Sequence, residues 1–325
     1  MERFFEMPAQ ENSEALLRKK FEEQFHNFEE IKLGEGEFEA IDLTPEEITD
    51  ETPVLLVPGY GKTPRSYKEL LFEIYKSGRR VISMTAPTMD ISLSKEEIPG
   101  IPKVQVTRAE ALLQLLKEKH INNVDVIGHS EGGMNATIAA SLDPGQFRHF
   151  VLVAPPGVTK EFSDSTPVLG EAVDWAIIGK RFAQNILHIR NESKNGTPEQ
   201  VTRYALADAE AKEFTKARGT LKATYESGFV GKVDISEILR TIHMSGHGVS
   251  VVAGVDDKML PMKKYQRDSD NNPRSADSIG IDGFYSVIKG HGEVHVNDDL
   301  CALVVEALTS LGKKYDKINS LANPE

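Results

Sequence analysis

The sequence has little cysteine, a shortage of positive charge and no long apolar run, and each shortage excludes a class of protein. A single cysteine, Cys301, excludes an internal disulfide and a structural metal site built on cysteines. With 38 Lys and Arg against 50 Asp and Glu, the formal net charge of −12 disfavours nucleic acid and anionic membranes as partners. No stretch is long enough to span a membrane and no signal peptide is visible, so we expect a cytoplasmic protein.

Strand-like and helix-like patterns alternate along most of the chain. Short apolar runs typical of buried parallel strands occur at 54–57, 81–84, 124–127, 150–154, 249–253 and 283–288. Segments with helical periodicity separate most of them. This order predicts an α/β fold in which helices cover both faces of a mostly parallel central sheet.

Four local patterns extend this prediction. Residues 14–28 have helical spacing of apolar residues, and we expect this helix to pack on the main domain. Residues 30–41 alternate in period two around a glycine-rich turn, which predicts a hairpin. The Thr-x-x-Glu spacing at 107–110 is that of a capping box and predicts the start of a helix. A last helix is expected over 294–311 and to end at Gly312, with Cys301 on its apolar face.

The alternation stops between residues 155 and 247, where helical segments occur without a convincing strand. This interruption predicts a helical cap inserted into the α/β core. Its Trp175 and Phe182 either line a substrate pocket or fill the core of the cap itself. The predicted organisation is an N-terminal helix (1–28), a core in two parts (29–154 and 248–312), the cap (155–247) and a polar tail (313–325).

The segment Gly128-His129-Ser130-Glu131-Gly132 carries the clearest chemical signal. It follows the run at 124–127 and opens a helix of small residues. Glycine on both sides of Ser130 permits a turn so sharp that side chains there would clash, which leaves the hydroxyl exposed beside the N–H groups of a helix start. An alternative is a glycine-rich turn in which the serine only caps the helix. The strand before it and the helix after it favour a nucleophile beside an anion site.

This strand–turn–helix arrangement resembles that of the α/β-hydrolase superfamily, and the resemblance runs from about residue 32 to residue 311. It implies that an acid and a histidine follow the nucleophile on loops after later strands. An aspartate four residues before a proline selects Asp257 as the acid, with Asp256 as the alternative; both could also be solvated turn residues. A Gly-His pair implies that His291 is the general base, and His295 is the other candidate.

The resemblance also implies an oxyanion site made of two backbone N–H groups. One belongs to Glu131, next to the nucleophile, and the other to Tyr60, in the turn after the run at 54–57. Many relatives have His-Gly at that turn, where this chain has Pro58-Gly59, so its local support is left open. Only the amide of Glu131 is given a role, because its charged side chain could point away from the oxyanion.

Two pairs of histidines, His243 with His247 and His291 with His295, have the four-residue spacing of zinc ligands on a helix. Glycines in and beside both pairs discourage a helix, and the glutamate between His291 and His295 is at the wrong offset for a zinc hydrolase motif. We therefore expect no metal ion and no cofactor.

A serine at position 130 favours acyl transfer to water, whereas an aspartate there would indicate dehalogenase or epoxide hydrolase chemistry. We therefore expect a carboxylesterase-like serine hydrolase that cleaves an ester, a thioester or an amide of a small or medium acyl substrate through an acyl-enzyme. The substrate and the oligomeric state do not follow from the sequence. Two alternatives are a binding protein that keeps the fold without turnover, and a lyase or haloperoxidase-type enzyme that uses the same triad.

Overall fold

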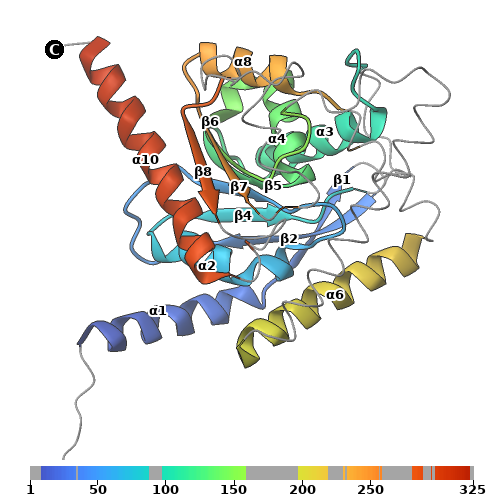
Figure 1. Ribbon diagram of the computed structural model, residues 1–325. Coiled ribbons are helices and arrows are strands. Elements are labelled where there is room, and N and C mark those ends of the chain that lie inside the picture. The colour runs from blue at the N-terminus through green and yellow to red at the C-terminus, as the bar shows by residue number, and fades with distance from the viewer. Residues whose placement is uncertain are drawn as a thin grey trace, which may run out of the picture.

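The computed structural model of the protein describes residues 9–33, 36–87, 97–158, 197–218, 230, 233–255, 257, 280–287, 294 and 297–322. Its strands are β1 (Glu29–Leu33), β2 (Gly36–Leu43), β3 (Val54–Val57), β4 (Val81–Met84), β5 (Val124–His129), β6 (Phe147–Val153), β7 (Gly248–Gly254) and β8 (Gly283–Val287). They form one sheet in the order β1-β2-β4-β3-β5-β6-β7-β8 (Figure 1). β2 is antiparallel to β1 and β4, and all other neighbours are parallel. The predicted mostly parallel sheet is confirmed.

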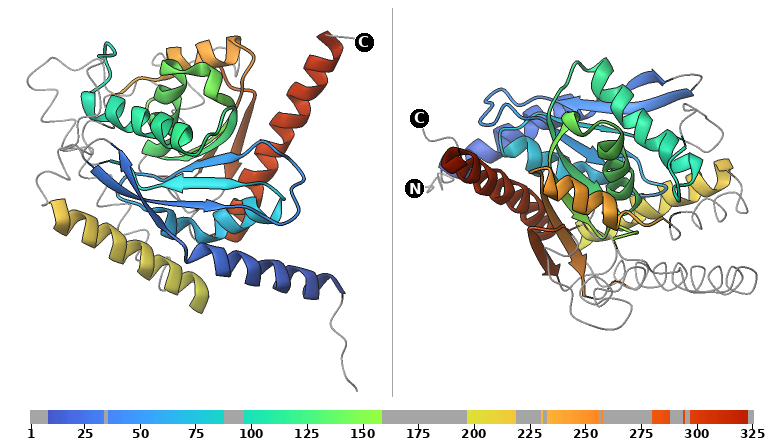
Figure 2. Two further views of the ribbon diagram at one scale, coloured as in Figure 1. Left: turned by 180° about the vertical axis from the view of Figure 1, so that it is seen from behind. Right: turned by 90° about the horizontal axis from the view of Figure 1, so that it is seen from above.

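Helices cover both faces of this sheet (Figure 2). They are α1 (Ala9–Phe25), α2 (Lys68–Lys76), α3 (Lys103–Glu118), α4 (Glu131–Leu142), α6 (Pro198–Arg218), α8 (Ser236–Met244) and α10 (Asp298–Ala322), with 3-10 turns η1 (Pro64–Tyr67) and η2 (Pro144–Gln146). Successive strand residues face opposite sides: Leu55 and Val126 pack with α3, α4 and α8, whereas Leu56 and Ile127 pack with α1, α2 and α10. Because these strands are buried on both faces, their sequences are mostly apolar and do not alternate between apolar and polar residues.

The expected N-terminal helix and hairpin are both present, but the helix spans Ala9–Phe25 where 14–28 was expected. β1 and β2 are a hairpin in which Leu33 pairs with Gly36. α1 packs on the main domain, because the ring of Phe21 lies 5.2 Å from that of Phe72 and 5.6 Å from that of Tyr75. Cys301 is buried on α10, and its burial raises the pKa of the thiol. The expectation that it serves as a small apolar residue agrees with this position.

Two other predicted helix boundaries are also wrong. α3 starts at Lys103, directly after Pro102, so the Thr-x-x-Glu pattern at 107–110 lies inside the helix and does not cap it. α10 continues through Gly312 to Ala322, and most of the predicted polar tail (313–325) is therefore helical. Its continuation is held by Tyr315, whose hydroxyl lies 3.1 Å from the carboxylate oxygens of Asp282. Such tertiary contacts outweigh the preference of glycine for helix ends.

Two described helices lie between β6 and β7. α8 packs against α4 and β7, on the core side of the molecule. α6 contacts η1, where Glu210 accepts a hydrogen bond from Thr63 at 3.2 Å and another from Ser66. Trp175 and Phe182 lie outside the described residues. Throughout the described ranges, each helix is too short or too polar to cross a bilayer.

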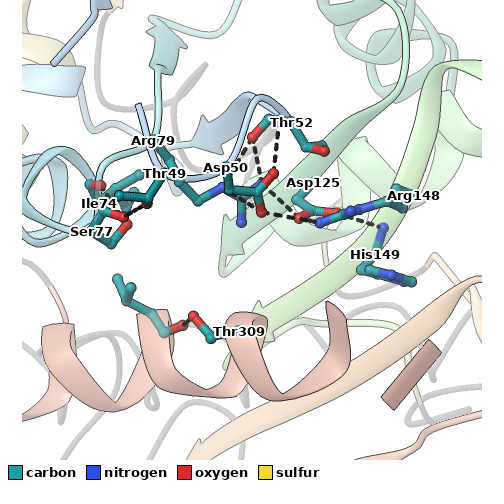
Figure 3. A network of polar contacts seen from close by, with 11 residues as sticks. Thr49, Asp50, Thr52, Ile74, Ser77, Arg79, Asp125, Arg148, His149 and Thr309 are labelled. Atoms are coloured by element: carbon teal, nitrogen blue, oxygen red, sulfur yellow. Dashed lines mark hydrogen bonds and ion pairs between the residues drawn. The ribbon is translucent and has the colours of Figure 1, made fainter. Parts of the chain in front are cut away.

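A buried ionic network joins the amino ends of the central strands (Figure 3). The carboxylate of Asp125, near the start of β5, lies 2.7 Å from Nη2 of Arg79 and 2.7 Å from Nη2 of Arg148. The same carboxylate accepts the backbone N–H of His149 at 3.1 Å, and the ring Nδ1 of His149 accepts the N–H of Gly248 at 3.0 Å. This end of the sheet is therefore fixed by charge and hydrogen bonding.

Candidate active site

Ser130 forms the corner between β5 and α4. Its backbone has φ 51° and ψ −126°, a conformation that residues with a side chain rarely adopt. Backbone hydrogen bonds hold it there: its N–H donates to the carbonyl of Val153 at 2.7 Å, and its carbonyl accepts the N–H of Gly133 at 3.0 Å. The sharp turn predicted at Ser130 is present, and it is a strained one.

The two flanking glycines are required by close packing of this corner. A Cβ on Gly128 would lie 2.4 Å from the Cα of Gly133, and one on Gly132 would lie 2.2 Å from the carbonyl oxygen of Val57. Both distances are far below contact distance, and both obstacles are backbone atoms. The G-x-S-x-G spacing therefore lets the start of α4 pack tightly on β5 and on the end of β3.

The turn after β3 passes directly against Ser130. A Cβ on Gly59 would lie 3.2 Å from the Cβ of Ser130 and 2.9 Å from Nδ1 of His129. Tyr60 follows in this turn, while Glu131 is the first residue of α4. The two residues expected to supply oxyanion donors therefore stand on the two segments that meet at Ser130. The N-terminus of α4 adds a partial positive charge there.

Support for this turn comes from Tyr67, a residue that no sequence motif had indicated. Its buried hydroxyl accepts the N–H of Gly59 at 3.0 Å and shares a hydrogen bond of 2.5 Å with Nδ1 of His129. Burial raises the pKa of Tyr67, so the hydroxyl remains protonated. Tyr67 thus joins the turn at Pro58-Gly59 to the residue before Ser130, which answers the question left open by the missing His-Gly.

The side chain of Glu131 points toward α3. Its carboxylate pairs with the guanidinium of Arg108 and accepts a hydrogen bond from Nε2 of Gln105 at 2.9 Å. Glu131 is 1% exposed and Arg108 is 2% exposed. Polar side chains are rarely buried alone, and here the three side chains form one buried polar cluster that no sequence pattern had indicated.

Asp257 lies beyond the carboxyl end of β7. Its side chain is buried, and its N–H donates to the carbonyl of Gly254 at 3.2 Å. Because β5, β6 and β7 are parallel, Asp257 and Ser130 follow the same edge of the sheet. His291, and the alternatives Asp256 and His295, lie outside the described residues.

Known proteins match this arrangement. The sequence model of the alpha/beta hydrolase fold family matches residues 52–279. An esterase from Exiguobacterium antarcticum superposes with a TM-score of 0.59 at 14% identity, covering 86% of this chain and 98% of its own. A thermophilic esterase from Thermogutta terrifontis gives 0.58 at 16% identity, covering 88% and 99%. A bromoperoxidase from Bacillus anthracis gives 0.55 at 16% identity, covering 87% and 100%.

A comparison with curated proteins finds no match. The structural neighbours share the fold at low identity, and the family match covers more than half of the chain, including the strand before Ser130, the turn at Tyr60 and the loop of Asp257. This chain is therefore a member of the α/β-hydrolase fold family.

Proposed function

We propose that the protein is a serine hydrolase that cleaves a carboxylic ester, a thioester or an amide through an acyl-enzyme on Ser130. The observation that carries the proposal is the corner at Ser130, with its positive φ of 51°, at the start of α4 and against the turn that leads to Tyr60. Strained backbone conformations of this kind cluster at active sites, where the surrounding structure holds them in place. Here it presents a hydroxyl beside two segments that carry N–H donors.

The topology supports Asp257 and His291 as the partners of Ser130. β5 and β7 are separated only by β6, and neighbouring strands lie about 4.8 Å apart, so the two loops begin roughly 10 Å apart. An imidazole that makes a hydrogen bond of about 2.8 Å from each nitrogen bridges such a gap. His291 comes shortly after β8, which is parallel to β7 and next to it in the sheet.

Each group has one task in the reaction. Oγ of Ser130 attacks the acyl carbon while His291 takes its proton, and Asp257 orients the imidazole and stabilises its charged form. The N–H groups of Tyr60 and Glu131 donate to the oxygen that becomes negative. His291 then returns the proton to the leaving group. Water, activated by the same histidine, releases the acid from Ser130.

The substrate is a small or medium acyl compound that reaches the site beneath a cap formed by the part of the insertion (155–247) that precedes α8, since α8 packs on the core. Support comes from α6, which is fastened to η1 through Glu210, Thr63 and Ser66, a few residues after Tyr60. A helix held there limits the room above the oxyanion turn. A screen of p-nitrophenyl esters of increasing chain length, with a thioester and an anilide beside them, defines the acyl preference; equal rates for all lengths would contradict a confining cap.

The decisive comparison is between the wild type and variants of the three proposed residues. We expect Ser130→Ala and His291→Ala each to abolish ester hydrolysis while circular dichroism and the denaturation midpoint remain near those of the wild type. Hydrolysis that survives in Ser130→Ala would overturn the proposal. Hydrolysis absent from the wild type itself would favour a binding protein that keeps the fold without turnover.

Asp256 and Asp257 provide a matched pair for the acid. Both variants, Asp257→Asn and Asp256→Asn, remove one charge from the same loop, but only the first removes the proposed partner of His291. We expect Asp257→Asn to lower kcat far more than Asp256→Asn. Equal and mild losses would show that the acid is another residue.

A further inference from the structure

Arg108 lies where three segments around the candidate site meet. Its Nε donates to the carbonyl of Pro87, in the segment after β4, at 2.9 Å. Its Nη1 pairs with the carboxylate of Glu131, the residue after Ser130. Its Cζ lies 5.8 Å from the centre of the Tyr60 ring, within the range of a cation–π contact. One side chain therefore contacts both residues whose N–H groups we assign to the oxyanion.

The stability of the fold is a poor explanation for this buried pair. Taking the two charges out of water costs about as much as their attraction returns, and apolar residues of similar volume commonly serve equally well. Arg108 and Glu131 are nevertheless both nearly inaccessible, and Glu131 directly follows the nucleophile in the chain. We therefore attribute the pair to the positions of the neighbouring residues that Arg108 contacts, and not to the stability of the fold.

Charge gives a second reason. A carboxylate on Glu131 without a partner would oppose the negative oxygen that forms beside the amide of the same residue. The guanidinium of Arg108 compensates that carboxylate, and Gln105 adds a hydrogen bond of 2.9 Å to it. Arg108 thus fixes the donors and removes an unfavourable charge from the site.

We propose that Arg108 is a positioning residue that holds the two oxyanion donors, Tyr60 and Glu131, where they can donate to the oxyanion of the transition state. This inference rests on the serine hydrolase function proposed above. A change at Arg108 should therefore lower kcat, because the oxyanion forms only during the reaction. Substrate binding in the ground state depends on it much less.

The test compares three changes at the pair. Arg108→Met leaves a buried carboxylate without its partner and is expected to lower kcat for p-nitrophenyl butyrate by about 100-fold. Arg108→Lys keeps the charge but not the fork geometry, so its loss is smaller. Arg108→Met with Glu131→Leu removes both charges and keeps an apolar filling. We expect this double variant to lose some stability, because the carbonyl of Pro87 and the amide of Gln105 each lose a hydrogen-bond partner, and to lose about tenfold in kcat.

A boronic acid provides the readout that a purely structural role would not change. Butylboronic acid forms a tetrahedral adduct on an active serine, with a polar oxygen in the oxyanion site. In the double variant its inhibition constant is expected to rise in proportion to the loss in kcat, while KM changes little. A double variant with wild-type kcat and wild-type inhibition would overturn the positioning role.

Arg79 is the matched control, because it is also a buried arginine in an ion pair, here with Asp125 at the opposite end of β5 (Figure 3). Arg79→Met leaves Asp125 paired with Arg148, and we expect lower stability with unchanged kcat. Equal losses of kcat in Arg79→Met and Arg108→Met would show that general destabilisation causes the loss, and this result would overturn the inference. Failure of the proposed function is distinguishable, since the wild type would then hydrolyse no faster than Ser130→Ala.

Discussion

Replacing Ser130 by glycine rather than alanine separates the strain at this corner from its chemistry. Both changes remove the hydroxyl, and both are expected to abolish hydrolysis. They differ in the backbone, because φ 51° and ψ −126° are unfavourable for alanine and readily adopted by glycine. Ser130→Gly is therefore expected to be the more stable of two inactive proteins, although glycine usually destabilises a fold.

The size of the difference follows from two opposing terms. Relief of a sparsely populated backbone conformation is worth about 1–3 kcal/mol. The greater freedom of glycine in the unfolded chain offsets roughly 0.5–1 kcal/mol of this gain. We expect Ser130→Gly to exceed Ser130→Ala by about 0.5–2 kcal/mol in the free energy of unfolding. For a chain of 325 residues, 1 kcal/mol corresponds to a shift in Tm of about 1.5 °C.

Urea denaturation followed by circular dichroism measures this difference, with scanning calorimetry as a second readout. His120→Gly is the matched control, because His120 is exposed, has φ 52° and lies beyond the end of α3, away from the site. It is expected to gain stability and keep its activity. If Ser130→Gly proves no more stable than Ser130→Ala, the claim that Ser130 stores backbone strain is refuted.

Three further predictions concern the surroundings of the site and the ends of the strands. Tyr67→Phe removes the acceptor of the Gly59 N–H, so kcat should fall by about tenfold and the free energy of unfolding by about 1–3 kcal/mol; unchanged kinetics would show that the turn needs no such support. Burial lowers the pKa of His149 in the folded protein below its ordinary 6.5. As the pH falls, His149 therefore takes up a proton more readily in the unfolded chain than in the folded one, and the free energy of unfolding should decrease below about pH 6.5. Urea titrations should show a weaker dependence in His149→Gln, and an equal dependence would contradict the argument. Burial also lowers the pKa of Lys62 from 10.5 to about 8. The buried charged ammonium therefore destabilises the fold below pH 8, and this cost decreases as the pH rises from 8 toward 10.5. Lys62→Met should therefore be more stable than the wild type at neutral pH, with the difference closing in alkali; a constant difference would exclude titration of Lys62 as its cause.

Much of the fold could be predicted from the sequence because its signals are local. The apolar run at 54–57 became β3, and the run at 124–127, interrupted by Asp125, became β5, since strands in the middle of a parallel sheet are buried on both faces. The corner at Ser130 could also be predicted, because glycine on both sides permits a turn that other residues would block. The predicted boundaries of α3 and α10 were wrong because each rested on a local pattern, a capping box in one and a glycine in the other. Contacts with other parts of the molecule outweighed both patterns.

The support of the candidate site could not be predicted, because it joins segments far apart in the chain. Tyr67 stabilises the turn at Gly59 and contacts His129, which is 62 residues away. Arg108 on α3 reaches Glu131 on α4. No spacing rule links such pairs. They become visible only when the sheet brings the carboxyl ends of β3 and β5 together and α3 packs against α4.

The most direct measurement is covalent labelling with a fluorophosphonate, followed by peptide mapping of the adduct by mass spectrometry. A single modification on Ser130, absent from Ser130→Ala and strongly slowed in His291→Ala, is the result that an imidazole-activated serine predicts. An intact, folded protein that takes up no label, or one that is labelled at another residue, would contradict it.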